Sequence, residues 1–230
     1  IGYLIYFNTV KSDDFINSPY NTRQDTFSDR VVRGSILSSD GEVLAQTNVS
    51  EDGTEERSYP YGNTFAHVVG YDTNGKSGLE SEANFQLLSS HEFFLNQIRN
   101  EFLGTKNTGD SVVSTLSGDL QTPAYNALGD RRGAVVALEP STGKILAMVS
   151  KPDFDPNTIS ENWDSLVNDE TNSSLLNRAT MGQYPPGSTF KVVTALDYFR
   201  THGSFNGFSF DCQGSITKEG HTIQCYNGNV

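Results

Sequence analysis

Two residues of this 230-residue chain have the types and the spacing needed for covalent catalysis, Ser188 and Lys191, in the stretch QYPPGSTFKVVTALDYF. Residues three apart lie on one face of a helix, so the serine hydroxyl and the lysine amine can come within hydrogen-bonding distance. A serine becomes a strong nucleophile when a neighbour accepts its proton. A lysine can accept it once desolvation or a nearby positive charge has displaced its own proton. The pair therefore indicates acyl transfer.

The residues around the pair predict the helix that must hold it. Pro185, Pro186 and Gly187 fix where the helix begins and let the backbone turn tightly. The helix is expected to run from Ser188 to His202 and to end at Gly203, because glycine is favoured directly after helix ends. Free N–H groups at the helix start would stabilise the oxyanion formed when the serine attacks a carbonyl. The expected apolar face consists of Phe190, Val193, Leu196 and Phe199.

The Ser-x-x-Lys spacing by itself is a weak signal, because the chain contains it three times. Ser141 and Lys144 span a predicted turn in PSTGK, and Ser215 and Lys218 lie in the loop-like stretch GSITKEG. Only the pair in the predicted helix has side chains that should converge. Even there, spacing alone leaves open a simpler interpretation, in which the serine caps the helix and the lysine is solvated.

Composition excludes some classes of function. The formal net charge is −12 and the pI is about 4.6, which argues against nucleic acid and against an anionic membrane surface as partners. No apolar run reaches the roughly 20 residues that cross a bilayer. The opening IGYLIYF, within residues 1–10, fits either the end of a membrane anchor or an ordinary amphipathic first element.

The first half of the chain is rich in predicted strands and turns. Residues 34–47 predict a hairpin that turns at Asp40-Gly41. We place a domain boundary near Asp110, which divides the chain into residues 1–110 and residues 111–230. Helical spacing over 81–102 is carried by Phe85, Leu88, Phe94, Leu95 and Ile98.

The second half begins with a predicted strand and a short helix, for which Ser117 is a candidate N-cap. Residues 133–150 predict a second hairpin that turns between Pro140 and Gly143. Its strands are nearly all apolar, so we expect them to be covered on both faces. The polar, Asn-rich residues 151–177 are expected to form a loop.

Longer stretches resemble a known family. GAVVALEPSTGKILAMVSKPDFDPN and LLNRATMGQYPPGSTFKVVTAL are similar to the start of a penicillin-binding transpeptidase domain, whose first signature is Ser-x-x-Lys. Upstream, RVVRGSILSSDGEVLAQT, RSYPYGNTFAHVVGY and GLESEANFQLL resemble the non-catalytic pedestal of class B penicillin-binding proteins. The resemblance runs in the right order from about Arg33 to Val230.

This resemblance implies an α+β fold. Residues 1–110 would form a strand-rich, dimerisation-like pedestal, and residues 111–230 the N-terminal part of a penicillin-binding/β-lactamase-like domain, an antiparallel sheet with helices. Arg33 in RGSI and Glu80 in GLE are expected to meet and brace the pedestal, as structural and not catalytic residues. The alternative is two separate surface charges.

The family's reaction is the cross-linking of peptidoglycan stem peptides. By resemblance, Ser188 is the acylated nucleophile and Lys191 the general base, no metal or organic cofactor is needed, and β-lactams are acylating inhibitors. The implied partners are D-Ala-D-Ala stem peptides and a membrane glycosyltransferase. The implied location is the extracytoplasmic side of the cell membrane, with a single-pass anchor.

The family's second signature is Ser-x-Asn, some tens of residues beyond the nucleophile, and its third is Lys-Thr-Gly, much further on. We expect neither of them to occur between Lys191 and Val230. We therefore expect this sequence to be a fragment that is inactive by itself. Rival functions are a D,D-carboxypeptidase, a β-lactamase, a β-lactam sensor and a catalytically inactive scaffold.

The two cysteines of the chain, Cys212 and Cys225, both follow the predicted catalytic helix. They flank QGSITKEGHTIQ, whose two glycines permit a hairpin-like return, so we expect the cysteines to approach each other. A thiol pair, one disulfide, or a metal site that includes His221 all remain open at this point.

Overall fold

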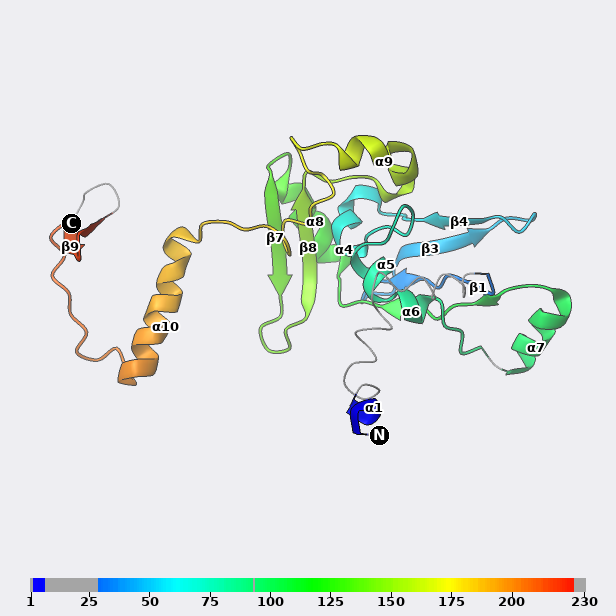
Figure 1. Cartoon of the computed structure of the whole chain (residues 1–230), viewed down its shortest axis with the longest axis horizontal. Coiled ribbons are helices and arrows are strands. Elements are labelled where there is room, and N and C mark those ends of the chain that lie inside the picture. The colour runs from blue at the N-terminus through cyan, green and yellow to red at the C-terminus, as the bar shows by residue number, and fades with distance from the viewer. Residues whose placement is uncertain (1, 7–28, 93, 226–230) are drawn as a thin grey trace. The chain divides into compact units, whose positions relative to one another are not determined.

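The computed structural model describes residues 2–6, 29–92 and 94–225, which form the mixed α+β architecture expected from the sequence (Figure 1). The chain divides into two compact units, Ile1–Gln183 and Tyr184–Val230. No helix in the described ranges is long and apolar enough to cross a membrane. Helix α1 (Gly2–Tyr6) falls in the stretch considered as an anchor, of which residues 1 and 7–10 lie outside the described residues.

A four-stranded sheet with the order β4-β3-β2-β6 forms the centre of the first unit. Strands β2 and β3 are antiparallel, as are β3 and β4, whereas β2 and β6 are parallel. The hairpin predicted at Asp40-Gly41 is confirmed, and Gly41 has the positive φ of +86° that favours glycine. The strands are β2 (Ile36–Leu37), β3 (Val43–Val49), β4 (Glu55–Ser58) and β6 (Val112–Val113).

Short helices pack against this sheet, and the continuous helix expected over 81–102 is interrupted. The chain leaves helical geometry after Leu87, where the Ser89 hydroxyl donates a hydrogen bond to the Phe85 carbonyl at 2.7 Å. Helix α7 then runs from Phe94 to Leu103. It is followed by β5 (Asn107–Thr108), which pairs in parallel with β1 (Val31–Val32). The elements before the interruption are η3 (Gly62–Thr64), α4 (Ala66–Val69), α5 (Gly78–Glu82) and α6 (Asn84–Leu87).

The main hydrophobic core lies between the sheet and the short helices. Burial of this apolar surface drives the packing of elements that are individually too short to be stable. Its buried residues are Ile36, Leu44, Ala45, Tyr59, Phe65, Val69, Ala83, Leu87 and Leu116.

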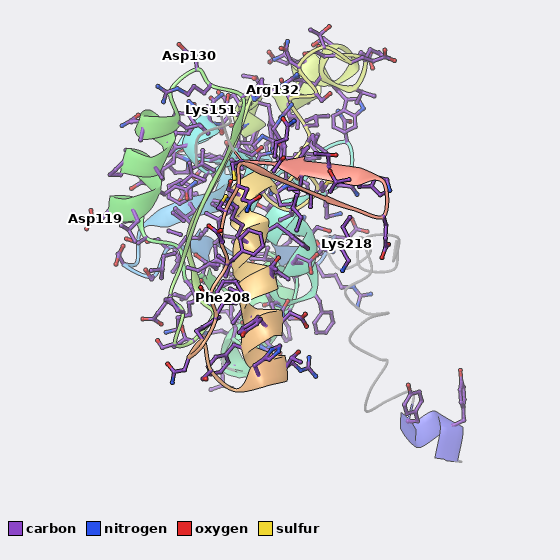
Figure 2. All side chains as sticks on the ribbon, turned by 90° about the vertical axis from the view of Figure 1, so that its left-hand side faces the viewer. Asp119, Asp130, Arg132, Lys151, Phe208 and Lys218 are labelled. Atoms are coloured by element: carbon purple, nitrogen blue, oxygen red, sulfur yellow. The ribbon has the colours of Figure 1, made fainter. Side chains whose placement is uncertain are left out.

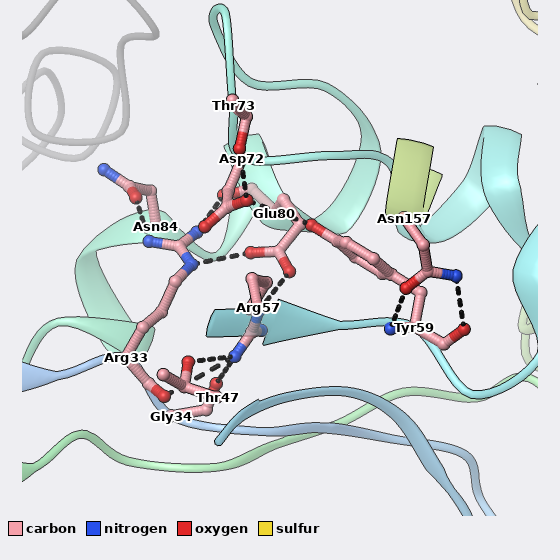
Figure 3. Close-up of polar contacts among 10 residues, drawn as sticks. All are labelled: Arg33, Gly34, Thr47, Arg57, Tyr59, Asp72, Thr73, Glu80, Asn84 and Asn157. Carbon is pink, nitrogen blue, oxygen red and sulfur yellow. Dashed lines mark hydrogen bonds and ion pairs between the residues drawn. The ribbon is translucent and has the colours of Figure 1, made fainter. Parts of the chain in front are cut away.

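A buried ion network also joins these elements (Figure 3). The Glu80 carboxylate accepts a hydrogen bond from Arg33 Nε at 2.7 Å and another from Arg57 Nε at 2.8 Å. Arg33 also donates to the Asn84 side chain and to the Glu80 carbonyl, and Arg57 donates to the Gly34 carbonyl. One carboxylate thus connects α5 to β4 and to the segment before β2.

The hairpin of β7 (Gly133–Leu138) and β8 (Ile145–Lys151) turns where the sequence predicts, with Gly143 at φ +76°. The prediction that both strands are covered on both faces is wrong for β7, because the residues of this strand alternate between half-buried and exposed within the unit. Helix α8 (Gly118–Leu128) packs on the hairpin (Figure 1), and Figure 2 shows Asp119 near its start and Asp130 beyond its end. Ser117 is its N-cap residue but makes no side-chain capping hydrogen bond.

Buried Gln121 fastens α8 to its surroundings. Its side-chain NH₂ donates to the carbonyls of Thr64 at 2.7 Å and Met148 at 2.8 Å, and its oxygen accepts from the Met148 N–H at 2.8 Å. Three hydrogen bonds from one amide therefore join α8, η3 and β8.

The loop expected over 151–177 contains a helix. After η4 (Pro156–Thr158), whose N-cap Asp155 accepts a hydrogen bond from the Asn157 N–H, α9 runs from Ile159 to Val167. Ile159 joins a second buried cluster with Ala66 and Phe154, and Trp163 packs against that cluster. Polar composition hid this helix, because only its core-facing positions are apolar.

Within the second unit, residues 184–225 form two helical elements and a hairpin. A single turn of 3-10 helix, η5 (Gly187–Thr189), leads into α10 (Phe190–His202). An antiparallel hairpin follows, formed by β9 (Ser215–Lys218) and β10 (His221–Gln224).

Candidate active site

Ser188 lies in η5, directly before α10, and the local backbone explains the residues that precede it. Pro186 has helical angles, with φ −68° and ψ −21°, whereas Gly187 has a φ of +54° that side chains with a Cβ rarely adopt. The predicted helix end is confirmed, since Gly203 is the C-cap in left-handed conformation at φ +74°. The structure differs from the predicted helix in that Ser188 and Thr189 lie in a 3-10 turn and α10 begins at Phe190.

Ser188 and Lys191 are both exposed within their unit, and among the described residues no hydrogen bond joins their side chains. The apolar face predicted for α10 is exposed within this unit too, with 55% of Phe190 and 62% of Leu196 accessible. Ser188 lies in the 3-10 turn and Lys191 in the first turn of α10, so a spacing of three residues places them on roughly the same side of the helix start.

Lys191 lines a cavity of about 480 Å³ between the start of α10 and the β9–β10 hairpin. Its other lining residues include Phe210, Cys212, Ile216, Ile223 and Cys225. The lysine therefore has mainly apolar and sulfur-containing neighbours on its hairpin side, although it remains open to water.

The other two Ser-x-x-Lys pairs do not lie on a helix. Ser215 and Lys218 lie in the same strand, β9, where residues three apart point to opposite faces. Ser141 and Lys144 span the turn between β7 and β8, where residues three apart do not share a helix face. Helical placement thus distinguishes Ser188 and Lys191 from both.

The expected approach of Cys212 and Cys225 is present, with their sulfur atoms 3.0 Å apart and both thiols free. The hydrogen bond from Cys225, aided by the Gly214 backbone, lowers the pKa of the Cys212 thiol. The same contact and partial burial raise the pKa of Cys225, whereas the charge of Lys191 acts in the opposite direction.

His221 does not lie beside the two cysteines. His221 pairs with Lys218 beside the hairpin turn, whereas the cysteines lie at the open end of the hairpin. At about 3.3 Å per strand residue, four residues separate His221 from Cys225 by roughly 13 Å along the strand. The described ranges contain no group of three or more His, Cys, Asp or Glu side chains arranged to hold a metal ion.

The expectation that Ser-x-Asn does not occur beyond the nucleophile is wrong for the string itself, since Ser204-Phe205-Asn206 has this pattern in the turn after α10. The Asn206 N–H donates to the Ser204 hydroxyl at 3.3 Å, so this serine serves the turn locally. Aromatic rings gather next to it, and Tyr198 stacks on His202 and meets Phe208 edge to face. The spacing of four between Tyr198 and His202 in α10 was the signal that could have revealed this cluster.

Two family models match the chain. Residues 33–112 match the penicillin binding protein A dimerisation domain, and residues 133–230 match the penicillin binding protein transpeptidase domain. The first match contains Arg33 and Glu80, and the second contains Ser188 and Lys191.

Curated relatives support the same assignment. Peptidoglycan D,D-transpeptidase PbpA of Mycolicibacterium smegmatis is 42% identical over 180 residues, which is 70% of this chain and 36% of the relative. Peptidoglycan D,D-transpeptidase MrdA of Escherichia coli is 30% identical over 184 residues, which is 64% of this chain and 29% of that protein. The chain thus spans about a third of the length of the curated relatives it matches.

Solved structures agree in fold as well as in sequence. The imipenem acyl-enzyme complex of penicillin-binding protein A from Mycobacterium tuberculosis has a TM-score of 0.75 and 31% identity, and the match covers 86% of this chain and 49% of that one. The D,D-transpeptidase domain of a peptidoglycan glycosyltransferase from Eggerthella lenta has a TM-score of 0.74 and 33% identity over 87% of this chain and 44% of that one. With a dimerisation segment and a transpeptidase segment in the order that the sequence motifs imply, the chain belongs to the class B penicillin-binding proteins.

Proposed function

We propose that this chain is the part of a peptidoglycan D,D-transpeptidase that carries its nucleophile, Ser188, and its general base, Lys191. The observation that supports this most directly is the position of Ser188 at the start of α10, after a glycine with φ +54°, within the segment matched by the transpeptidase model. Acyl-enzymes form with β-lactams in the related protein of known structure. The pedestal would be residues 1–110 and the transpeptidase part residues 111–230.

The reaction begins when Ser188 Oγ attacks the carbonyl carbon of the penultimate D-alanine and transfers its proton to Lys191. The negative charge on the carbonyl oxygen is stabilised by backbone N–H groups at the helix start. The tetrahedral intermediate collapses, the C–N bond breaks, and the terminal D-alanine leaves with the proton.

An amine of a neighbouring stem peptide then attacks the carbonyl carbon of the ester on Ser188. This step forms the cross-link and frees the serine hydroxyl. A β-lactam enters the same first step, because its ring amide is the bond that breaks. The ring nitrogen remains attached to the acyl group, so a stable ester is left on the serine. The substrate partners are D-Ala-D-Ala stem peptides, supplied by a membrane glycosyltransferase on the extracytoplasmic side.

The test is acylation of the chain, extended to the length of its relatives, by a labelled penicillin, read by mass spectrometry of the labelled peptide. The label should appear on Ser188, and Ser188→Ala should abolish it. The matched controls Ser141→Ala and Ser215→Ala remove the serines of the other two Ser-x-x-Lys pairs and should label like the unchanged protein. Label that persists in Ser188→Ala would refute the assigned nucleophile.

A second measurement separates transpeptidation from the rival functions. The extended protein, given lipid-linked substrate, should yield cross-linked peptides together with free D-alanine. Free D-alanine without cross-links would instead identify a carboxypeptidase, and an acyl-enzyme with neither product a β-lactam sensor.

A further inference from the structure

The β9–β10 hairpin has a cysteine at each side of its open end. The Cys225 N–H donates to the Gly214 carbonyl at 2.8 Å, which continues the ladder beyond the pair Ser215 and Gln224. This brings the two sulfur atoms to 3.0 Å although the residues are 13 apart in sequence. The hairpin therefore has a close pair of thiols at its open end, where the two strands diverge.

Among the described residues, the two strands of the hairpin bury little surface. All eight residues of the two strands are exposed. An isolated two-stranded hairpin is marginally stable in water, because it buries too little apolar surface. A covalent bond between its ends would remove much of the freedom of the open form.

The thiol pair and Lys191 line the same cavity of about 480 Å³. Lys191 is close enough for its charge to act on Cys225. A change in how firmly the hairpin is closed therefore changes the surroundings of this amine.

We propose that Cys212 and Cys225 form a redox-sensitive clamp on the cavity beside Lys191. As a disulfide they hold the hairpin closed and limit the access of water and reagents to the amine. As two thiols they let the hairpin open. The effect of the clamp on catalysis rests on the proposed role of Lys191 as general base. The formation of the clamp does not depend on that role.

The oxidant is a disulfide of a small thiol or of a dithiol–disulfide oxidoreductase. Cys212 has the lowered thiol pKa, so its thiolate attacks one sulfur of the oxidant, forms a mixed disulfide and releases the first thiol. Cys225 then attacks the Cys212 sulfur and releases the second thiol. Two protons and two electrons leave the protein, and one disulfide of the oxidant becomes two thiols.

The first experiment treats this chain with oxidised glutathione and measures its mass before and after digestion. We expect the loss of two hydrogens and one peptide pair joined through Cys212 and Cys225. Two thiols that stay free, or a reaction that stops with glutathione attached, would refute the clamp.

The second experiment acetylates the oxidised and the reduced chain with an amine-reactive reagent and follows each lysine by mass spectrometry. Lys191 should react several-fold more slowly in the oxidised chain, whereas Lys144, in the β7–β8 turn, should react equally in both. The double variant Cys212→Ser/Cys225→Ser should show the fast rate at Lys191 whatever the oxidant. Equal rates at Lys191 in both redox states would contradict the proposal.

Penicillin labelling of the extended protein in both redox states then links the clamp to the proposed function. A labelling rate at Ser188 that changes with redox state in the native protein, and not in the double variant, would support both. If Ser188 is not labelled at all, the proposed function fails, while the mass and acetylation results still decide the clamp.

Discussion

Arg33 and Glu80 are 47 residues apart in sequence, yet their side chains form a hydrogen-bonded ion pair of 2.7 Å inside the pedestal. Glu80 is fully buried and Arg33 nearly so, and the second oxygen of the same carboxylate is taken by Arg57. The pair lies in the segment matched by the dimerisation-domain model, so we propose that its role is to brace that segment.

Glu80→Gln should destabilise the chain strongly. The substitution leaves two guanidinium groups facing a neutral amide in a buried site, and loss of one partner of a buried ion pair costs about 3–5 kcal/mol. Urea denaturation measures the change in the free energy of unfolding. Glu82→Gln, on the exposed side of the same helix, is the control and should change it by less than about 1 kcal/mol. Equal effects of the two changes would contradict a bracing role.

Gln121→Leu should also destabilise the chain, although leucine has a similar size. It leaves the carbonyl of Thr64 and both backbone groups of Met148 without the amide that satisfies them, and a buried unpaired polar group costs about 1–3 kcal/mol. The neighbouring exposed change Thr122→Ala should be nearly neutral in the same denaturation assay. A stability gain in Gln121→Leu would show that the three hydrogen bonds are not needed.

Stability should fall as the pH drops below about 6.5, because of His67. Burial lowers the pKa of His67 below 6.5, and the positive charge of Arg178 acts in the same direction. The hydrogen bond from Nε2 to the Pro152 carbonyl and the charge of Asp153 act in the opposite direction but are smaller. Below 6.5 the unfolded chain therefore binds a proton that the folded chain excludes, which favours unfolding.

The melting temperature measured from pH 8 to pH 5 tests this expectation. His67→Phe retains an aromatic ring against Phe154 and should flatten the profile below pH 6.5. His221→Gln, at an exposed position, should leave the profile unchanged. A profile that keeps its slope in His67→Phe would assign the pH dependence to other groups.

Gly187→Ala should slow acylation of Ser188 in the extended protein. Alanine at φ +54° is strained by about 1–2 kcal/mol, and relief of that strain moves the start of α10 and Ser188 with it. We expect labelling with penicillin to slow about tenfold. Gly143→Ala has comparable strain, at φ +76° in the β7–β8 turn, and should label at the normal rate. Similar losses in both variants would point to a general loss of folding.

The 230-residue chain by itself should label much more slowly than the extended protein. Ser188 and Lys191 are exposed within their unit, and backbone N–H donors stabilise an oxyanion far less in water than in a closed site that excludes water. Parallel time courses of labelling measure the ratio. Equal rates would mean that η5 and α10 suffice for acylation.

Local signals in the sequence predicted part of this structure correctly. Asp40-Gly41 predicted a hairpin, and Gly203 predicted the end of α10, because the backbone angles at both places are set by the residue type. Helix α9 was missed although Ile159, Trp163 and Leu166 have helical spacing, since the polar residues between them are those typical of loops.

Tertiary features could not be predicted in the same way. Strands β1 and β5 have two residues each, too few for any periodicity, and their pairing is decided by the surrounding packing. The site shows the same limit. The spacing of Ser188 and Lys191 predicted a shared helix face, but the cavity beside Lys191 depends on a hairpin more than twenty residues further along the chain.

The parallel pairing of Ile36 with Val112 also sets an order of events during synthesis. Strands β2, β3 and β4 are neighbours in sequence and can pair soon after they leave the ribosome. Strand β6 adds to the other edge of β2 only after every residue up to Val113 has emerged, because contacts distant in sequence form late. Until then, the unpaired edge of β2 is open to other strands, so slow translation through residues 59–111 would prolong the interval in which the nascent pedestal can aggregate.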